Sequence, residues 1–378
     1  MNILFRAGRS IPNKALSLSH LKGLLWADVL YRATSEVHRV SLCRNQRVFD
    51  SAQQVLNFWA YIDAHHRTSD FRSWTESDIS NAYVQMHTTQ FTITAVERAA
   101  YRERVEHDCW EHPVSTRLRS IWASQAKRLG LRFSPNPSDD LDCISIGAVV
   151  QKLKNANACL DMRADGGPLY LDFTDEGIPL RQLISTDGES NYVMCALRAI
   201  LSEYGSESHA DRVDLVVLGY DREASADYLC IERLLGRLGI ATKRLEMHRV
   251  PIEGKTLSAR FGFREHYSVD ALFDRMNAFA DDESIRLGLR LYFVAHLGRV
   301  SSENFEETKL VSFIQRAQRI LNDDVSNSTS ESVAESVETL KSLSKKTGYV
   351  DPYRATSSLF DRGQRGQRIR SLATEIFL

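Results

Sequence analysis

The sequence predicts an α/β protein whose parallel sheet is assembled from two segments that lie far apart along the chain. In the second segment, residues 213–218 are dominated by valine and leucine between polar neighbours, a pattern typical of a strand buried on both faces. Apolar residues then recur at helical spacing from Tyr228 to Leu238, and residues 241–250 return as a strand. Strand, helix and strand within about 40 residues predict a βαβ crossover, whose ligands bind beyond the carboxyl ends of the strands.

The first segment shows the same pattern at the start of the sequence. Residues 2–5 predict a short strand, a helical apolar face runs from Leu21 onward, and residues 37–42 predict a second strand. We expect the helix to begin at His20, with Ser19 as its cap. A helix N-terminus attracts phosphate through its free amides and its dipole, so the polar turn before this helix is a candidate phosphate site.

The remaining segments lead to a prediction of four parts. Residues 51–165 are mostly helical in pattern, residues 168–173 predict a strand, and two helical stripes follow residue 285. Residues 322–338 are rich in Ser, Asn, Asp and Glu, which predicts a linker or an exposed loop. The predicted parts are the first half of the sheet domain at 1–50, a helical insertion at 51–165, the second half of the sheet domain at 166–280 and a C-terminal helical segment at 281–378.

The composition is that of a globular protein without a strong net charge. Of 378 residues, 43% are hydrophobic and 26% are charged, and the formal net charge is −1. No global positive field attracts nucleic acid, so any RNA contact must come from a local patch. The six cysteines form no CxxC pair, which predicts reduced thiols in a cytoplasmic protein. Without a signal-peptide core or a run of ~18 apolar residues, we expect neither secretion nor membrane insertion.

Three short motifs accompany the predicted strands in a fixed order. They are RSIPNKALSLSHLKGLLWADVL at residues 9–30, TDGESNY at 186–192 and GKTLSARFG at 254–262. Their order and spacing resemble the catalytic core of class I aminoacyl-tRNA synthetases, most closely that of arginyl-tRNA synthetase, over roughly residues 1–320. The resemblance implies a split Rossmann fold, in which two βαβ halves form one nucleotide-binding sheet, with a helical insertion and a small, truncated C-terminal helical domain.

The same resemblance implies a chemistry and a set of residues. The chain would be a ligase that uses ATP and Mg²⁺ to convert an amino acid to an aminoacyl-adenylate, which needs positioning and charge neutralisation and no covalent nucleophile. His20, at the start of the first helix, and the loop residues Lys255, Ser258 and Arg260 would be catalytic. The residues implied to bind ATP are Ser17, Ser19, Gly219, Asp221, His248 and Val250.

The residues implied to bind the amino acid substrate, here called the substrate end of the site, depart from the family pattern. The substrate-binding positions implied by the resemblance are Asp139, Asp187, Tyr192, Ala196 and Arg222. The family's carboxylate for the guanidinium of arginine aligns with Ala196, and its asparagine for the substrate amino group aligns with Ile11. A buried guanidinium without a carboxylate partner is destabilised by several kcal/mol, so the pattern argues against arginine as the substrate.

Three functions stay open on the sequence. The first is the amino-acid-activating enzyme, whose acceptor is a tRNA acceptor stem, a peptide or a small amine. The second is a catalytically inactive paralogue that binds tRNA or a protein. The substituted positions Ser17, Ser19, Ile11 and Ala196 favour it. The third is a nucleotidylyltransferase, which shares the histidine-bearing loop. The segment EHDCWEH at 106–112 has no second ligand pair at a finger-like spacing, so we expect no metal site there.

Overall fold

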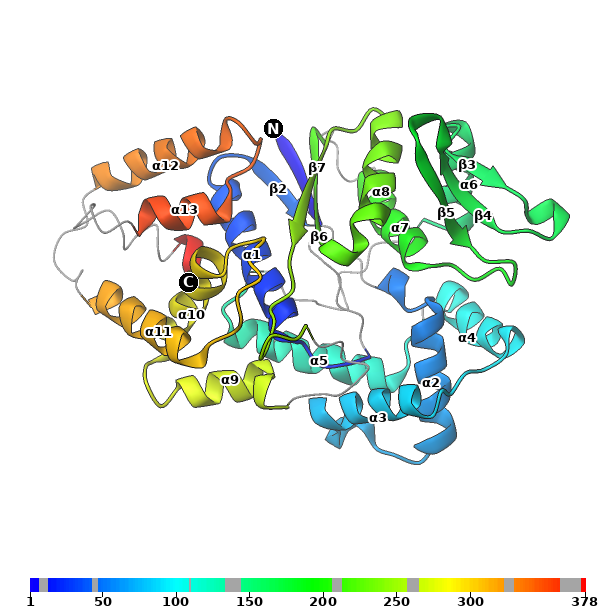
Figure 1. Ribbon diagram of the computed structural model, residues 1–378, viewed down its shortest axis with the longest axis horizontal. Coiled ribbons are helices and arrows are strands. Elements are labelled where there is room, and N and C mark those ends of the chain that lie inside the picture. The colour runs from blue at the N-terminus through cyan, green and yellow to red at the C-terminus, as the bar shows by residue number, and fades with distance from the viewer. Residues whose placement is uncertain are drawn as a thin grey trace.

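A four-stranded parallel sheet lies at the centre of the computed structural model (Figure 1). The structure describes residues 1–6, 13–42, 47–108, 110–132, 144–205, 213–256, 265–322, 330–360 and 375–378. The strand order is β2–β1–β6–β7, and the β1–β6 pair joins the two distant segments. The strands are β1 (Asn2–Arg6), β2 (Arg39–Leu42), β6 (Leu215–Asp221) and β7 (Thr242–Met247). The predicted α/β fold with a parallel sheet built from two segments is therefore confirmed.

Strand β6 is buried on both faces, as its apolar sequence predicts. Val216 and Leu218 pack with the helices on one face, and Val217 packs with the helix on the other. Side chains alternate between the faces of a strand, so a strand covered on both sides needs an unbroken apolar run. The covering helices are α1 (Leu18–Ser35) on one face, and α7 (Tyr192–Gly205) and α8 (Ser225–Arg237) on the other.

Helix α1 begins two residues before the predicted start, and Ser17 is its N-cap. The Ser17 hydroxyl accepts a hydrogen bond from the His20 amide, and the His20 side chain accepts one from the Ser17 amide, which forms a capping box. The prediction of Ser19 as the cap is wrong. The Ser19 hydroxyl instead accepts a hydrogen bond from the Val250 amide, so it serves the opposite half of the sheet domain.

The segment between the two halves contains five helices in its described residues and a small antiparallel sheet. Strand β4 was predicted, but β5 was not, because several of its residues are exposed and polar and give no apolar alternation. Four of the helices pack around an aromatic core that includes Trp59 and Tyr83, whereas helix α6 packs in a second core with the small sheet. The elements are α2 (Gln53–His65), α3 (Glu76–Thr88), α4 (Ala95–His107), α5 (Pro113–Arg128), α6 (Ile146–Asn155), β3 (Cys159–Asp161), β4 (Leu169–Phe173) and β5 (Ile178–Ile184).

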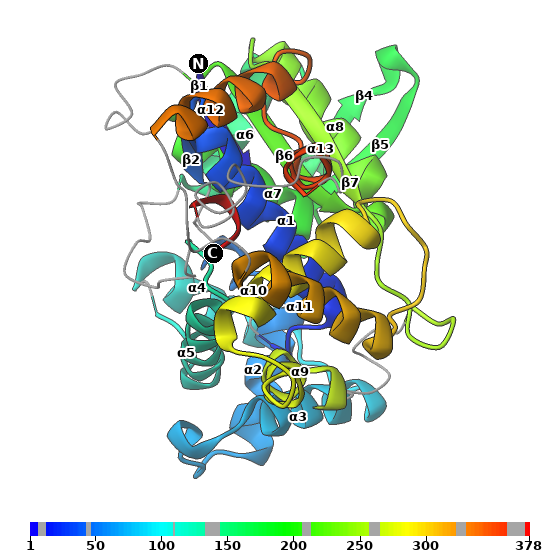
Figure 2. The ribbon, with the colours of Figure 1, turned by 90° about the vertical axis from the view of Figure 1, so that its left-hand side faces the viewer.

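The C-terminal part is helical and packs against α1 (Figure 2). Its elements are α9 (Val269–Met276), α10 (Asp282–Arg290) with the π-helical turn Leu291–His296, α11 (Glu307–Asn322), α12 (Ser330–Ser344) and α13 (Pro352–Leu359). The linker prediction is wrong for residues 330–338, which belong to α12. Leu340 anchors this helix in the core beside Trp26, so burial overrides the polar composition. Within the described residues, no helix is both long enough and apolar enough to span a bilayer.

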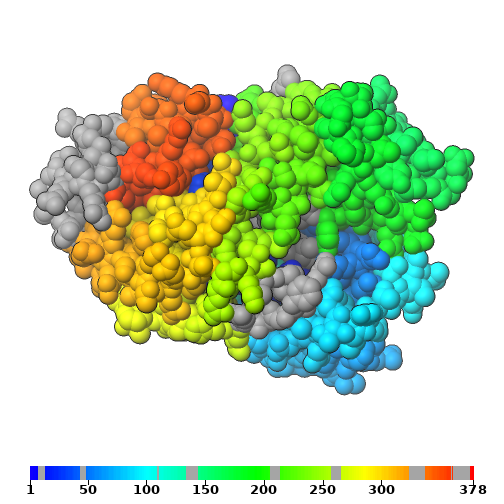
Figure 3. Space-filling view, in the orientation of Figure 1, coloured from blue at the N-terminus to red at the C-terminus, as the bar shows by residue number. Residues whose placement is uncertain are grey.

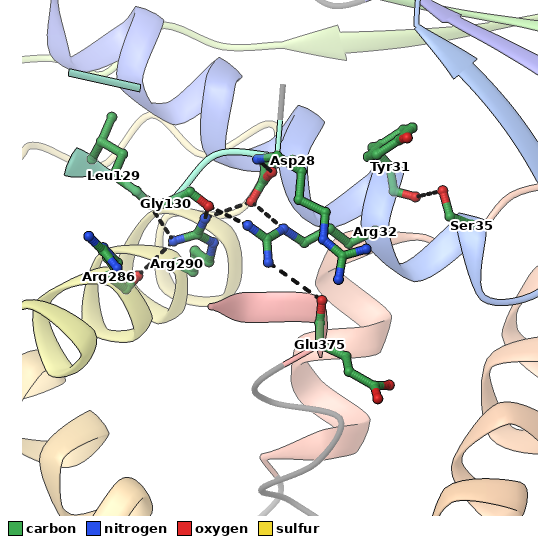
Figure 4. Close-up of polar contacts among 10 residues, drawn as sticks. Asp28, Tyr31, Arg32, Ser35, Leu129, Gly130, Arg286, Arg290 and Glu375 are labelled. Carbon is green, nitrogen blue, oxygen red and sulfur yellow. Dashed lines mark hydrogen bonds and ion pairs between the residues drawn. The ribbon is translucent and has the colours of Figure 1, made fainter. Parts of the chain in front are cut away.

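A buried ion cluster ties α1 to the C-terminal helices (Figure 4). Asp28 and Arg290 are both fully buried, with Arg290 Nη2 2.6 Å from Asp28 Oδ2. Arg32 Nε lies 3.0 Å from the same oxygen, and the Arg132 amide donates to Asp28 Oδ1 at 2.9 Å. Both guanidinium groups also donate to the Gly130 carbonyl after α5. One carboxylate therefore compensates two buried positive charges and joins three parts of the fold.

Helices α10 and α11 approach closely at Gly288, which gives a testable contact. A Cβ atom there would lie 2.6 Å from Ile314 Cα and 2.6 Å from its Cγ1, so the backbone of α11 would have to move. We expect Gly288→Ala to lower the free energy of unfolding by about 1–3 kcal/mol in urea titrations. Gly236→Ala is the control, because nothing lies within 4 Å of a Cβ at that helical position. Equal stability of the Gly288→Ala variant and the wild type would contradict the close packing.

Candidate functional site

The start of α1 meets the segment after β7 at the carboxyl edge of the parallel sheet. The Ser19 hydroxyl accepts a hydrogen bond from the Val250 amide at 2.9 Å, and Lys22 Nζ donates to the His248 carbonyl at 3.1 Å. These bonds join residues from the two halves of the sheet domain. Figure 3 shows a hollow on this face of the molecule, below the β7 strand. Because ligands of parallel sheets bind beyond the carboxyl ends of the strands, this edge is the candidate site.

His20 lies in the first turn of α1 as a neutral hydrogen-bond donor. Burial and the positive charges of Lys14 and Arg249 lower its pKa to about 3, so the imidazole is uncharged near neutral pH. Its Nδ1 accepts a hydrogen bond from the Ser17 amide at 3.0 Å, which assigns the proton to Nε2. The first amides of a helix have no intrahelical partner. His20 Nε2–H and these amides are thus suited to bind an anion without carrying a charge.

The depressed pKa of His20 predicts a pH dependence of stability. Below about pH 6.5 the unfolded histidine takes up a proton that the folded one refuses, so stability is lost as the pH falls. One such group contributes up to about 1.4 kcal/mol per pH unit. We expect the stability of the wild type relative to His20→Gln to fall by about 1–2 kcal/mol between pH 7 and pH 5, measured by urea unfolding. The exposed His107→Gln variant is the control, and parallel pH profiles for all three proteins would contradict the prediction.

The end of β6 contributes a group of charged side chains near His20. Arg249 Nε lies 2.6 Å from Asp221 Oδ2, and Arg249 Nη2 lies 2.6 Å from Glu223 Oε2. Asp221 and Arg249 both influence the pKa of His20, so the three side chains are close. Asp221 also caps the turn after β6 by accepting from the Glu223 amide at 3.1 Å. The structure thus places this pair of charges beside the start of α1.

The other residues assigned to ATP binding, and Arg222, which was assigned to the substrate, lie around the same edge. His248 Nε2 lies 3.1 Å from Glu246 Oε1, and the His248 amide donates to the Arg299 carbonyl at 2.9 Å. Gly219 lies inside β6, where it pairs with Leu245. The exposed Arg222 follows Asp221 directly. Of the nucleotide-end predictions, Ser17, Ser19, Asp221, His248 and Val250 are therefore gathered at one end of the sheet.

The predicted loop begins with a tight turn that presents Lys255 to solvent. Ile252 and Lys255 exchange both backbone hydrogen bonds at 3.0 Å, and Glu253 and Gly254 between them have φ values of 52° and 75°. The Gly254 amide donates to Asn304 Oδ1 at 2.7 Å, which fixes the turn to the segment before α11. Ser258 and Arg260 lie outside the described residues, as do Ile11 and Asp139.

Two polar residues of this region were not predicted from the sequence. Asn13 is 1% exposed, and neither its amide nitrogen nor its amide oxygen has a hydrogen-bond partner. Lys22 is 1% exposed, and burial together with the positive charge of Arg299 lowers its pKa to about 8. The sequence could have indicated that Lys22 is buried, because this residue directly follows Leu21 in a helix that was predicted to be covered. No sequence pattern distinguishes Asn13 from an ordinary turn residue.

Two of the residues predicted to bind the substrate, Asp187 and Tyr192, lie around the start of α7. Tyr192 lines a cavity of about 580 Å³ between the helical insertion and β5, and its hydroxyl donates to Gln54. Glu189, the carboxylate among the described lining residues, is paired with Arg98. Asp187 is exposed at the tip of the turn before α7. The lining is rich in amides, contributed by Gln53, Gln54, Asn57, Gln90, Gln182 and Asn191.

Ala196 has a different environment from Tyr192. Its side chain is fully buried in the core under α7, and its carbonyl accepts a hydrogen bond from Arg6 Nη1 at 3.0 Å. Arg6 is the last residue of β1 and was not among the predicted site residues.

In the EHDCWEH segment, His112 caps α5 by accepting a hydrogen bond from the Val114 amide at 3.1 Å. That histidine therefore has a structural role.

Comparison with solved structures identifies the fold. Arginyl-tRNA synthetase from Thermus thermophilus matches with a TM-score of 0.58 and 15% identity, covering 100% of this chain and 79% of that chain. Arginyl-tRNA synthetase from Plasmodium falciparum matches with a TM-score of 0.59 and 11% identity, covering 95% and 68%. No family model and no curated protein sequence matches. The chain therefore has an arginyl-tRNA synthetase-like fold, which confirms the resemblance that its motifs predicted.

Proposed function

We propose that this chain binds ATP at the carboxyl edge of its parallel sheet and activates an amino acid as an aminoacyl-adenylate. One observation carries the proposal: the start of α1, with its neutral His20, converges with the ends of β6 and β7. The hydrogen bond from Val250 to Ser19 holds the two segments together. The synthetase-like fold supports the same proposal, and the helical insertion of this chain lines a cavity together with residues of β5 and the start of α7.

In the proposed reaction, a carboxylate oxygen of the amino acid attacks the α-phosphorus of ATP. The bond from that phosphorus to the bridging oxygen breaks, and pyrophosphate leaves with the bonding electron pair, so no proton transfer is needed. His20 Nε2–H and the first amides of α1 donate to phosphate oxygens. Lys255 and Arg260 neutralise the charge that develops on pyrophosphate.

The described residues fit a polar phosphate ligand. A buried amide without partners is unfavourable, and Asn13 precedes α1 by a few residues in the chain, so a ligand that reaches it would satisfy its hydrogen-bonding groups. Arg249 engages the carboxylates of Asp221 and Glu223, so Mg²⁺ is expected to arrive coordinated to the ATP phosphates. The described residues contain no group of three metal-ligating side chains.

The acceptor of the aminoacyl group is a tRNA or a non-tRNA amine. A second candidate function is that of a catalytically inactive synthetase-like module that binds tRNA or a protein. The capping box favours it, because the Ser17 hydroxyl, at the position of the family's first histidine, is held by His20 and is not free for phosphate. The two candidates differ in whether the chain binds ATP and activates an amino acid with it.

Amino-acid-dependent exchange of pyrophosphate into ATP tests the proposal. We expect exchange with at least one member of a panel of the twenty amino acids, and loss of exchange in the double variant Lys255→Ala/Arg260→Ala. Calorimetry with ATP and Mg²⁺ accompanies the assay. Tight, magnesium-dependent ATP binding would argue against the inactive module, whereas exchange with no amino acid would count against the proposed activation. Absence of both binding and exchange in folded protein would refute the proposed activation and favour the inactive module.

A further inference from the structure

Arg6 lies at the ligand-binding edge of the sheet, on the face that α7 covers. It is the last residue of β1, and Leu4, two residues earlier on the same face, packs in the core with α7. Arg6 Nη1 donates to the Ala196 carbonyl of α7 at 3.0 Å. Phe5 belongs instead to the opposite face, which α1 covers. Arg6 therefore extends from the sheet edge toward the substrate end of the proposed site.

The guanidinium of Arg6 is buried, and within the described part of the chain no carboxylate forms an ion pair with it. The residue is 4% exposed, and its Nε has no hydrogen-bond partner. Its contacts among the described residues are the Ala196 carbonyl and the ring of Phe49, whose centroid lies 5.4 Å from Cζ. Other buried arginines of this chain, such as Arg290 and Arg98, face carboxylates. An unpaired buried cation is strongly unfavourable, so Arg6 points to an anionic group brought by a ligand.

The charge pattern at the substrate end is opposite to that needed for arginine. The motif position expected to hold a carboxylate for a guanidinium is Ala196, whose methyl group is buried in the core. The nearby carboxylate Glu189, in the cavity lined by Tyr192, is already neutralised by Arg98. The contact between Arg6 and the Ala196 carbonyl thus brings a positive charge to the backbone of the residue at which the motif resemblance implies a negative side chain.

We propose that Arg6 binds the side-chain carboxylate of an acidic amino acid, and that the substrate class of this chain is a dicarboxylic amino acid. This inference rests on the proposed function, because it names the amino acid activated at the same site. A phosphate of ATP is the other anion that a guanidinium recognises. The face of the sheet favours the carboxylate, since Arg6 lies under α7 and His20 belongs to α1 on the opposite face.

Calorimetry on the full chain tests this with ligands that differ in one group. Glutamate against glutamine, and aspartate against asparagine, isolate the side-chain carboxylate, while arginine and ATP are titrated separately. We expect each acid to bind about tenfold to a hundredfold more tightly than its amide. Arg6→Gln should remove this preference, and Arg6→Lys should retain part of it because the charge remains. The matched control Arg72→Gln replaces an exposed arginine on the insertion.

Each outcome decides the inference. Equal affinity for glutamate and glutamine, absence of binding by either acid, or an acid preference that survives in Arg6→Gln would overturn it. A selective loss of ATP affinity in Arg6→Gln would also overturn it, since that would assign Arg6 to phosphate. The wild-type preference and the Arg6→Lys variant decide the matter if Arg6→Gln does not fold. Acid binding without pyrophosphate exchange would refute the proposed reaction alone, and exchange supported only by neutral or basic amino acids would refute this inference alone.

Discussion

Replacement of Asp28 with alanine is expected to lower the free energy of unfolding by about 3–5 kcal/mol. Asp28 is fully buried between Arg290, at 2.6 Å, and Arg32, at 3.0 Å. Its removal leaves two buried guanidinium groups with carbonyl partners only and also takes the acceptor from the Arg132 amide. Urea unfolding followed by circular dichroism measures the loss.

The control is Asp282→Ala on α10, whose carboxylate is 58% exposed and lies 3.9 Å from Arg286. Exposed pairs of this kind contribute about 0–1 kcal/mol, so this variant should be nearly as stable as the wild type. A double-mutant cycle with Arg290→Met completes the test. The loss in Asp28→Ala/Arg290→Met should be smaller than the sum of the single losses, because one unpaired charge is removed. Strict additivity would contradict a shared ion cluster.

Replacement of His20 with alanine is expected to slow pyrophosphate exchange by about 10²–10³-fold with little change in stability at pH 8. In the wild type, the capping box orients the uncharged Nε2–H donor of His20 away from Ser17. Alanine has no such donor, so one preorganised contact to the phosphate is lost. Because the pKa of His20 is about 3, the wild-type rate should show no titration of this residue near pH 6.5. Steady-state exchange kinetics from pH 5.5 to 8.5 measure both effects.

Two further variants serve as comparisons for His20→Ala. His107→Ala replaces an exposed histidine at the end of α4 and should leave the rate unchanged. His20→Gln retains an amide donor and an acceptor for the Ser17 amide, so its loss of rate should be smaller than that of His20→Ala. Wild-type kcat and KM in the His20→Ala variant would show that the imidazole takes no part in the proposed reaction.

The sequence predicted those parts of the fold whose burial is uniform. Strand β6 and helix α1 were recognisable because every face that the apolar pattern marks is covered by another element. Strand β5 was missed because much of it is exposed, and α12 was missed because polar residues dilute its apolar positions. In both cases tertiary contacts, such as those of Leu340, decide the structure.

The candidate site was predictable where the residues follow a strand or begin a helix. His20 and Asp221 have such positions, and the structure brings them close together. Arg6 and Asn13 were missed because their significance depends on burial without partners, which no local pattern encodes. The role of Ser19 was misassigned because its partner, Val250, lies 231 positions away.

Helix α1 extends from the proposed phosphate site to the ion cluster and packs against the C-terminal helices through Trp26 and Val29. The sheet and the C-terminal helices should therefore melt as one cooperative unit, giving a single calorimetric transition. Nucleotide bound at the start of α1 should slow amide hydrogen exchange in α10 and α13 as well as at the site itself.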